Sequence, residues 1–134
     1  LGYLHRKVVY HDPCELGRGS GIYEEPRAVI SYVADLQQSQ HEKNMALCCG
    51  GSLGNLTLSS GKRSIIAADA ARSLTASSPD ELITACPLCK KTLGQATETK
   101  VTDIAELVAA ALPATLPKAR TRTKKALVKT EKIG

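Results

Sequence analysis

The chain has 134 residues, the length of about one domain, and 43% of them are hydrophobic, which is enough to form a core. That core must be aliphatic, because the sequence has four Tyr, no Phe and no Trp. No stretch approaches the ~20 apolar residues of a membrane-spanning helix, so the sequence predicts no transmembrane segment. The chain begins at Leu1 rather than Met, and we therefore expect it to be a piece of a longer polypeptide.

The net charge of +5 is concentrated at the carboxyl-terminal end. Residues 113–134 contain seven Lys or Arg and one acidic residue, a charge of +6, which leaves −1 for residues 1–112. We therefore predict a folded domain at 1–112 and a basic, disordered tail or linker at 113–134. The tail has no aromatic side chain that could stack on bases, so a solvated end is favoured over contact with nucleic acid or an acidic membrane.

The first half of the chain predicts two strands around one helix. The segment KVVYHDP (7–13) is typical of a short buried strand that Pro13 ends, and the glycine-containing segment 14–24 predicts a loop. Pro26 favours the start of a helix, which apolar residues at helical spacing continue. The apolar run NMALCC (44–49) predicts a second strand that ends at a pair of adjacent cysteines.

The second half continues the alternation. Ser59 or Ser60 can cap a helix through residues 62–76, and DELITAC (80–86) predicts a third strand. Pro87 then favours the start of another helix. The segment 101–112 predicts an amphipathic helix that Thr102 or Asp103 caps and Pro113 ends.

This alternation of strands and helices predicts an α/β fold: a small, mostly parallel sheet built from βαβ units with flanking helices. Ligands of such sheets bind at the carboxyl ends of the strands. Each cysteine cluster follows a predicted strand, so we expect the three clusters to meet at one edge of the sheet.

Five cysteines carry the chemistry, with the spacing Cys-x33-Cys-Cys-x36-Cys-x2-Cys. An odd number argues against a closed set of disulfides and favours a reducing, cytoplasmic compartment. Thiolates are soft ligands that select zinc, Cu(I) or iron–sulfur clusters. Five exceed the four that zinc or an ordinary four-iron cluster needs, which indicates either an unusual cluster or one spare, reactive thiol.

Three segments, YHDPCELGRGSGIYEEPR, ALCCGGSLGN and ITACPLCKKTL, together resemble the cysteine-rich CCG domain. This domain occurs in the B and D components of heterodisulfide reductases and in iron–sulfur oxidoreductases of glycolate, lactate and glycerol-3-phosphate oxidation. The resemblance covers residues 7–111. It implies a ligand set of Cys14, Cys48, Cys49, Cys86 and Cys89 for a 4Fe-4S cluster, which is non-cubane in the heterodisulfide reductases; other CCG domains hold a structural zinc. It also implies partner subunits and a second CCG domain upstream.

The leading hypothesis is therefore an iron–sulfur electron-transfer domain of a cytoplasmic oxidoreductase, either heterodisulfide reductase-like or part of a quinone-linked dehydrogenase. Whether the domain itself reduces a disulfide or only relays electrons stays open, and so does its status as an enzyme. Association with a membrane through the complex is compatible with this hypothesis. The alternatives are a zinc-binding structural or interaction module and a metal-free thiol redox site on Cys86 and Cys89.

Residues near the sulfurs fit a cluster. Gly50 and Gly51 allow the backbone to lie close to an inorganic core, and their amides can donate hydrogen bonds to sulfur. The helix that Pro87 begins would direct its positive end at the site. Lys90 and Lys91 either add positive charge there or form a solvated helix face.

The remaining polar residues near these motifs have structural interpretations that we favour over functional ones. We expect His11 to hold a loop through a backbone hydrogen bond rather than to act as a ligand or proton donor. Arg18 and Tyr23 are expected to anchor the loop rather than to bind an anionic substrate. Asp12 is expected to make a turn hydrogen bond. His5 and His41 are expected at the surface.

Overall fold

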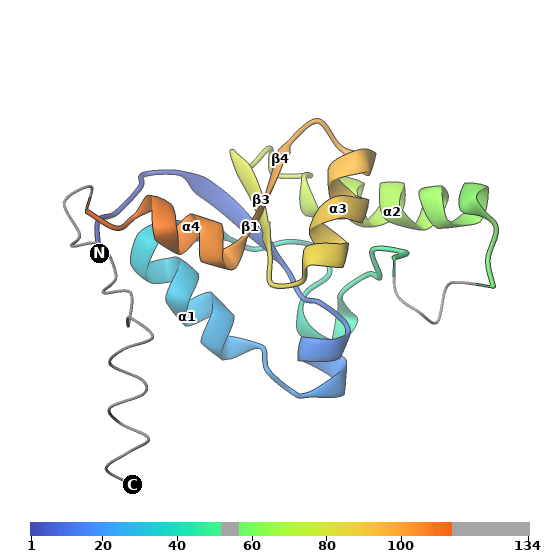
Figure 1. The fold of residues 1–134 in the computed structure, drawn as a ribbon, viewed down its shortest axis with the longest axis horizontal. Helices are drawn as coiled ribbons and strands as arrows, with labels where there is room; N and C mark the ends of the chain where they lie inside the picture. The colour runs from blue at the N-terminus through green and yellow to red at the C-terminus, as the bar shows by residue number, and fades with distance from the viewer. Residues whose placement is uncertain (52–56, 114–134) are drawn as a thin grey trace, which may run out of the picture.

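A parallel β-sheet lies between two layers of helices in the computed structural model of the chain, which describes residues 1–51 and 57–113 (Figure 1). Four strands pair in the order β2-β1-β3-β4, and every pairing is parallel. The strands are β1 (Lys7–His11), β2 (Asp35–Gln37), β3 (Glu81–Thr84) and β4 (Lys100–Asp103). The prediction of an α/β fold with a parallel sheet is confirmed.

In the described part of the chain, four α-helices cover the two faces of the sheet, with α1 and α4 on one face and α2 and α3 on the other (Figure 1). The helices are α1 (Glu24–Val33), α2 (Ser60–Leu74), α3 (Pro87–Ala96) and α4 (Ile104–Ala110), with a π-helical turn η1 (Glu15–Gly19) and a 3-10 turn η2 (Lys43–Met45). The expected caps form: Ser59 accepts a hydrogen bond from the amide of Lys62 at 3.2 Å, and Asp103 accepts one from that of Ala105 at 2.8 Å.

The alternation of side chains along the central strands divides the core into two clusters. Val8 and Tyr10 of β1 face α1 and α4, whereas Val9, between them, faces α2 and α3. In β3, Ile83 joins the first cluster and Leu82 the second. These strands are apolar on both faces, as expected of parallel strands that helices cover from both sides.

The predicted second strand at residues 44–49 is wrong. The strand that follows α1 is β2, which begins only two residues after the helix ends and pairs directly with β1. Residues 43–45 instead form the turn η2, and residues 46–49 have no regular structure. The apolar run in this segment reflects burial of Ala46 and Cys49 rather than strand pairing.

The predicted helix at 101–112 is shorter than expected, because its first residues form the strand β4. Val101 and Thr102 pair with Leu82 and Ile83 of β3, a position that suits their β-branched side chains. The helix α4 begins only at Ile104. Residues 114–134 of the predicted basic tail lie outside the described residues.

No helix within residues 1–51 and 57–113 combines the length and the apolar character that crossing a bilayer requires. The helices of this part of the chain instead have buried positions that face the sheet and exposed positions on the opposite side.

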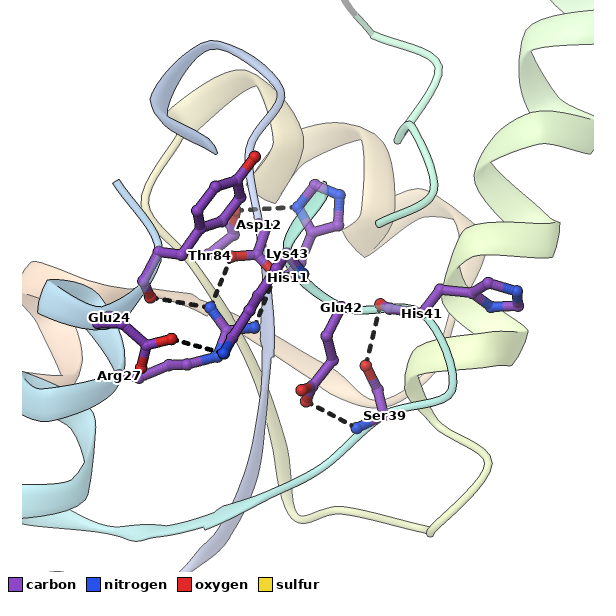
Figure 2. A network of polar contacts seen from close by, with 10 residues as sticks. His11, Asp12, Glu24, Arg27, Ser39, His41, Glu42, Lys43 and Thr84 are labelled. Carbon is purple, nitrogen blue, oxygen red and sulfur yellow. Dashed lines mark hydrogen bonds and ion pairs between the residues drawn. The ribbon is translucent and has the colours of Figure 1, made fainter. Parts of the chain in front are cut away.

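A buried ion pair links α1 to the end of β1 (Figure 2). Both guanidinium nitrogens of Arg27 donate to the two carboxylate oxygens of Asp12 at 2.7 Å, and the guanidinium lies 5.2 Å from the centre of the Tyr10 ring. The side chain of Asp12 is 2% exposed and that of Arg27 is 11% exposed. Asp12 therefore joins an ion pair across the fold, which corrects the expectation of a local turn hydrogen bond.

Replacing Arg27 with Ala should lower the free energy of unfolding by roughly 3–5 kcal/mol, because it leaves the carboxylate of Asp12 buried without its cation. Chemical denaturation of the reduced protein measures this loss. The matched control is Arg72→Ala, which removes an exposed ion pair with Asp69 and should change stability by no more than about 0.5 kcal/mol. Equal losses in the two variants would contradict the structural role of the buried pair.

Candidate metal-cluster site

The strand order creates a crevice between β1 and β3. From β1 the chain passes through α1 to β2 on one side, whereas β3 pairs with β1 on the other side. The carboxyl ends of two such strands form the crevice in which open α/β sheets bind ligands. Cys14 lies three residues beyond the end of β1, and Cys86 lies two residues beyond the end of β3. Two of the three predicted cysteine clusters therefore follow strands that flank this crevice.

The adjacent pair Cys48–Cys49 reaches the same edge of the sheet without a strand to carry it. Three hydrogen bonds tie the preceding segment to the end of β1 and to the loop after it. The amide of Lys43 donates to Asp12 at 2.8 Å, Arg18 donates to the carbonyl of Ala46 at 3.1 Å, and His11 Nε2 lies 3.1 Å from the carbonyl of Leu47. Side chains rather than strand pairing therefore position the cysteine pair.

His11 makes one of these three hydrogen bonds and also contacts β3. A carbonyl oxygen can only accept, so Nε2 carries the hydrogen of the bond to Leu47, and Nδ1, 3.3 Å from Thr84 Oγ1, accepts from that hydroxyl (Figure 2). Burial lowers the pKa of His11, which agrees with a neutral ring. The structural role expected for His11 is confirmed.

The five thiols form one connected group. The sulfur atoms of Cys49 and Cys89 are 3.2 Å apart, within hydrogen-bonding distance, and both side chains are buried. Cys86 interacts with Cys89, and Cys48 interacts with Cys49. Burial raises the pKa of Cys14, and the nearby thiols of Cys48 and Cys49 raise it further. The predicted convergence of the three clusters is therefore what the structure contains.

The Cys49–Cys89 pair holds one proton over a wide pH range. Its shared hydrogen bond lowers the pKa of Cys49 to about 6 and, together with burial, raises the pKa of Cys89. The amide of Gly51 also donates to Cys49 Sγ at 3.4 Å, and that of Gly50 donates to Cys48 Sγ at 3.3 Å. These hydrogen bonds favour the thiolate form of Cys49, the form in which cysteine binds metals.

Gly50 and Gly51 fit between α2 and α3 where no side chain fits. Gly50 has a φ of 82°, and a Cβ there would lie 2.8 Å from the carbonyl oxygen of Arg63. A Cβ on Gly51 would overlap Thr92 Oγ1 and lie 3.3 Å from Leu88 Cγ. The close approach expected of these glycines is real, and it brings the cysteine pair against both helices.

The helix α3 begins at the cluster, with Cys86 as its N-cap residue and Pro87 in its first turn. A cavity of about 500 Å³ opens beside this helix start, between Cys14, Cys86 and Cys89. Lys90 pairs with Glu106 of α4 and so belongs to the helix surface, whereas Lys91 faces a second cavity between α2 and α3. The two lysines therefore have different environments.

The loop residues take the structural roles expected of them, with one correction. Arg18 anchors the segment before the cysteine pair, and the ring of Tyr23 packs so closely on Gly17 that a Cβ there would lie 2.8 Å from it. His5 is exposed as expected. His41 is half-buried instead, because its Nδ1 lies 2.9 Å from Ser73 Oγ of α2.

Arg27 was not among the residues predicted to matter, although the sequence holds a signal for it. In the helix that continues from Pro26, Arg27 precedes the buried Ile30 by three residues and therefore lies on the buried face. A cation at that position requires a buried anion, and Asp12 is that anion.

The donor set fits a thiolate-ligated metal group. Within residues 1–51 and 57–113, no three His, Cys, Asp or Glu side chains lie close enough together to bind a single metal ion. The thiols are instead linked in pairs next to a cavity, with hydrogen bonds that favour the thiolate of Cys49 and two backbone amides directed at sulfur. This arrangement suits a group that several sulfurs contact at different atoms better than one tetrahedral ion.

Comparison with known proteins agrees with these features. The family model described as "Cysteine-rich domain" (CCG) matches residues 8–94. The chain is 31% identical over 122 residues to one subunit of the dihydromethanophenazine:CoB--CoM heterodisulfide reductase of Methanosarcina barkeri, an alignment that covers 81% of the chain and 28% of that protein. No solved structure matches the chain.

Two further relatives come from bacteria. The chain is 38% identical over 122 residues to a "Probable membrane-anchored ferredoxin" of Chromohalobacter salexigens, covering 84% of the chain and 18% of that protein. It is 26% identical over 115 residues to the "Probable iron-sulfur-binding oxidoreductase FadF" of Bacillus subtilis, covering 79% of the chain and 16% of that protein. The chain thus spans less than a third of the length of each of these three relatives.

In the reduced, metal-free protein the ultraviolet absorbance of thiolate should rise near pH 6 as Cys49 ionises. In Cys89→Ala the rise should move to higher pH, because the hydrogen bond is lost while burial still opposes the charge. The control Cys14→Ala should keep the rise near pH 6. A wild-type protein without thiolate below pH 8 would contradict the shared proton.

Gly51→Ala should destabilise the protein by about 1–3 kcal/mol, the usual cost of forcing extra volume into a packed site. Adding Thr92→Ala should restore part of this loss, because the added methyl group overlaps Thr92 Oγ1. Chemical denaturation of both single variants and the double variant measures this coupling. The control is Gly94→Ala, which lies in α3 like Thr92 but has open space around it, and which should not destabilise the protein. Strict additivity of the two substitutions would contradict the predicted overlap.

Proposed function

This chain belongs to the family of cysteine-rich CCG domains, and on that premise we propose that it binds an iron–sulfur cluster and transfers electrons as one domain of an oxidoreductase. The observation that carries this proposal is the meeting of five thiols at the crevice between β1 and β3, with the sulfurs of Cys49 and Cys89 3.2 Å apart. Relatives named as an iron–sulfur-binding oxidoreductase and a ferredoxin support the same cofactor class.

The proposed ligands are Cys14, Cys48, Cys49, Cys86 and Cys89, holding a four-iron cluster of the non-cubane type. When bound, such a cluster supplies one-electron chemistry. The protein contributes the amides of Gly50 and Gly51, which donate hydrogen bonds to cysteine sulfur and so stabilise added negative charge. Because five sulfurs exceed the four that an ordinary cluster needs, one of the five ligands could leave the cluster to exchange with a disulfide, with electrons supplied through the partner domains, and we include disulfide reduction in the proposal on this ground.

The proposed setting is a multi-subunit complex in the cytoplasm. The relative from Methanosarcina barkeri is named as a subunit of a reductase. Because the chain spans only part of its relatives, we propose that other domains or subunits, including a second CCG domain, supply and accept the electrons. One relative is named as membrane-anchored, which supports attachment of such a complex to a membrane.

The other two interpretations have less support from the geometry. A structural zinc needs four sulfurs around one ion and leaves the fifth thiol without a role. A metal-free redox pair of Cys86 and Cys89 does not explain the hydrogen bond between the sulfurs of Cys89 and Cys49.

Anaerobic reconstitution with iron and sulfide should give a brown protein that contains both, and a reduced sample should give an EPR signal. Substituting Ser for Cys49 or Cys89 should remove most of the iron, because both sulfurs are buried inside the site. Iron and acid-labile sulfide analysis measures the loss in all five Cys→Ser variants.

The matched control is Ser20→Ala, which alters the same cavity without removing a sulfur and should retain its iron. A Cys→Ser variant that retains full iron would identify the spare thiol. A colourless wild-type protein that takes up one zinc and no sulfide would overturn the proposal in favour of the structural module.

A further inference from the structure

A second cavity lies between α2 and α3, behind the glycines that follow the cysteine pair. Its volume is about 690 Å³, within the range of small-molecule sites, and Gly50 and Gly51 form part of its wall. Cys14, Cys86 and Cys89 line the other cavity, and no cysteine lines the α2–α3 pocket, so the two cavities are distinct although Leu88 contributes to both walls.

The α2–α3 pocket is positively charged. Arg63 of α2 and Lys91 of α3 line it from opposite helices, and no carboxylate among the described residues contributes to its wall. The hydroxyls of Ser64 and Thr92 already donate to the backbone carbonyls of Ser60 and Leu88, so among the described residues the hydroxyl of Ser60 is the one that can add a further donor. The composition therefore suits an anion rather than a cation or a purely apolar ligand.

The cations of this pocket have no anionic partner in the part of the chain that the structure describes. Arg27, Arg6 and Lys90 each pair with a carboxylate, but the ion pairs among residues 1–51 and 57–113 include neither Arg63 nor Lys91. The Nε atom of Arg63 is buried and donates to no acceptor among these residues. A buried donor without an acceptor is unfavourable, and an oxygen of a bound anion would satisfy it.

The charge pattern at the start of α2 points in the same direction. The positive end of the helix macrodipole favours acidic residues in the first turn, but α2 has none there and carries Lys62 and Arg63 instead. Ser60, the first residue of this 15-residue helix, lines the pocket. This helix start is unfavourable by itself, and an anion in the pocket would compensate both the dipole and the cations.

The volume of the pocket exceeds that of a bare ion, and part of its wall is apolar. Ala67, Ala68, Leu88 and Ala96 line it beside the charged groups. From these features we propose that the α2–α3 pocket binds a small organic molecule through a carboxylate or phosphate group, which Arg63 and Lys91 hold from opposite sides.

The pocket adjoins the thiol site through Gly50 and Gly51, which belong to its wall. The carbonyl of Arg63 packs against Gly50, and Thr92 packs against Gly51. The amides of these two glycines donate to the sulfurs of Cys48 and Cys49. Gly50 and Gly51 therefore contact the pocket wall and also donate to the cysteine sulfurs, so occupancy of the pocket bears directly on that backbone.

Calorimetric titration of the reduced, metal-free chain tests the binding independently of any cluster, so the proposal stands or fails apart from the proposed function. The probes are inorganic phosphate and butyrate, with butyramide as the uncharged match of butyrate, at constant ionic strength. We expect phosphate or butyrate to bind and butyramide not to bind. Binding of phosphate alone indicates a phosphate-bearing ligand, and binding of butyrate alone indicates a carboxylate.

Arg63→Gln and Lys91→Gln should each lower the affinity about tenfold, the loss expected for one charge-assisted hydrogen bond. Lys62→Gln removes a cation from the same turn of α2 outside the pocket and is the matched control, with affinity close to that of the wild type. Gln95→Glu places a carboxylate at an exposed position in the pocket wall and should abolish binding without disturbing the core.

The absence of binding by both anions would overturn the proposal. So would wild-type affinity in Arg63→Gln and Gln95→Glu, or an equal loss of affinity in Lys62→Gln and Arg63→Gln, which would indicate non-specific attraction. Circular dichroism of each variant establishes that it is folded, and Gln95→Glu keeps the test decisive if Arg63→Gln does not fold.

Discussion

The carboxylate of Asp12 is the interaction on which the rest of the site depends. Its two oxygens accept hydrogen bonds from the two terminal nitrogens of the Arg27 guanidinium on α1. Oδ2 also accepts a hydrogen bond from the backbone amide of Lys43 (Figure 2). A single buried group thus connects the first helix, the end of the central strand and the chain that leads to Cys48. A buried carboxylate without hydrogen-bonding and cationic partners is strongly destabilising, so Asp12 holds all three segments in one arrangement.

His11 adds directionality to this connection. As a neutral ring it uses one nitrogen toward Thr84 of β3 and the other toward Leu47 of the cysteine-bearing segment. Since β1 and β3 flank the crevice, the ring spans the two strands and the irregular segment at once. The position of the Cys48–Cys49 pair is consequently set by the polar side chains of His11, Asp12 and Arg18. The glycines after the cysteines permit close packing against α2 and α3 and donate their amides to the two sulfurs.

Much of this arrangement is readable from the sequence, and the exceptions have physical causes. The alternation of elements, the helix caps at Ser59 and Asp103, and the meeting of the cysteines follow from local patterns and from the rule for parallel sheets. The sequence does not predict β2, because its three residues are polar or half-exposed at the sheet edge, where no apolar run marks them. The strand β4 was read as helix because it continues into α4 without a break, and only pairing with β3 distinguishes the two.

The site could be predicted as a set of sulfurs but not as a geometry. The helical spacing of Arg27 from Ile30 indicates that Arg27 is buried, but it does not identify Asp12 as its partner. The missing acceptor at the buried Nε of Arg63 likewise depends on which side chains the fold brings together. Local rules are broken at the start of α2, where cations replace the acids that a helix start favours, and such exceptions tend to mark functional positions.

The two hydrophobic clusters differ in their content of sulfur. Cys49 and Cys89 are members of the cluster between the sheet and the α2–α3 layer, whereas the cluster beneath α1 and α4 contains no cysteine. Oxidation or ligation of Cys49 and Cys89 would therefore act directly on the packing of the α2–α3 layer. Amide hydrogens of α2 and α3 would then exchange at rates that follow the state of the sulfurs, while those of α1 and α4 would serve as an internal reference.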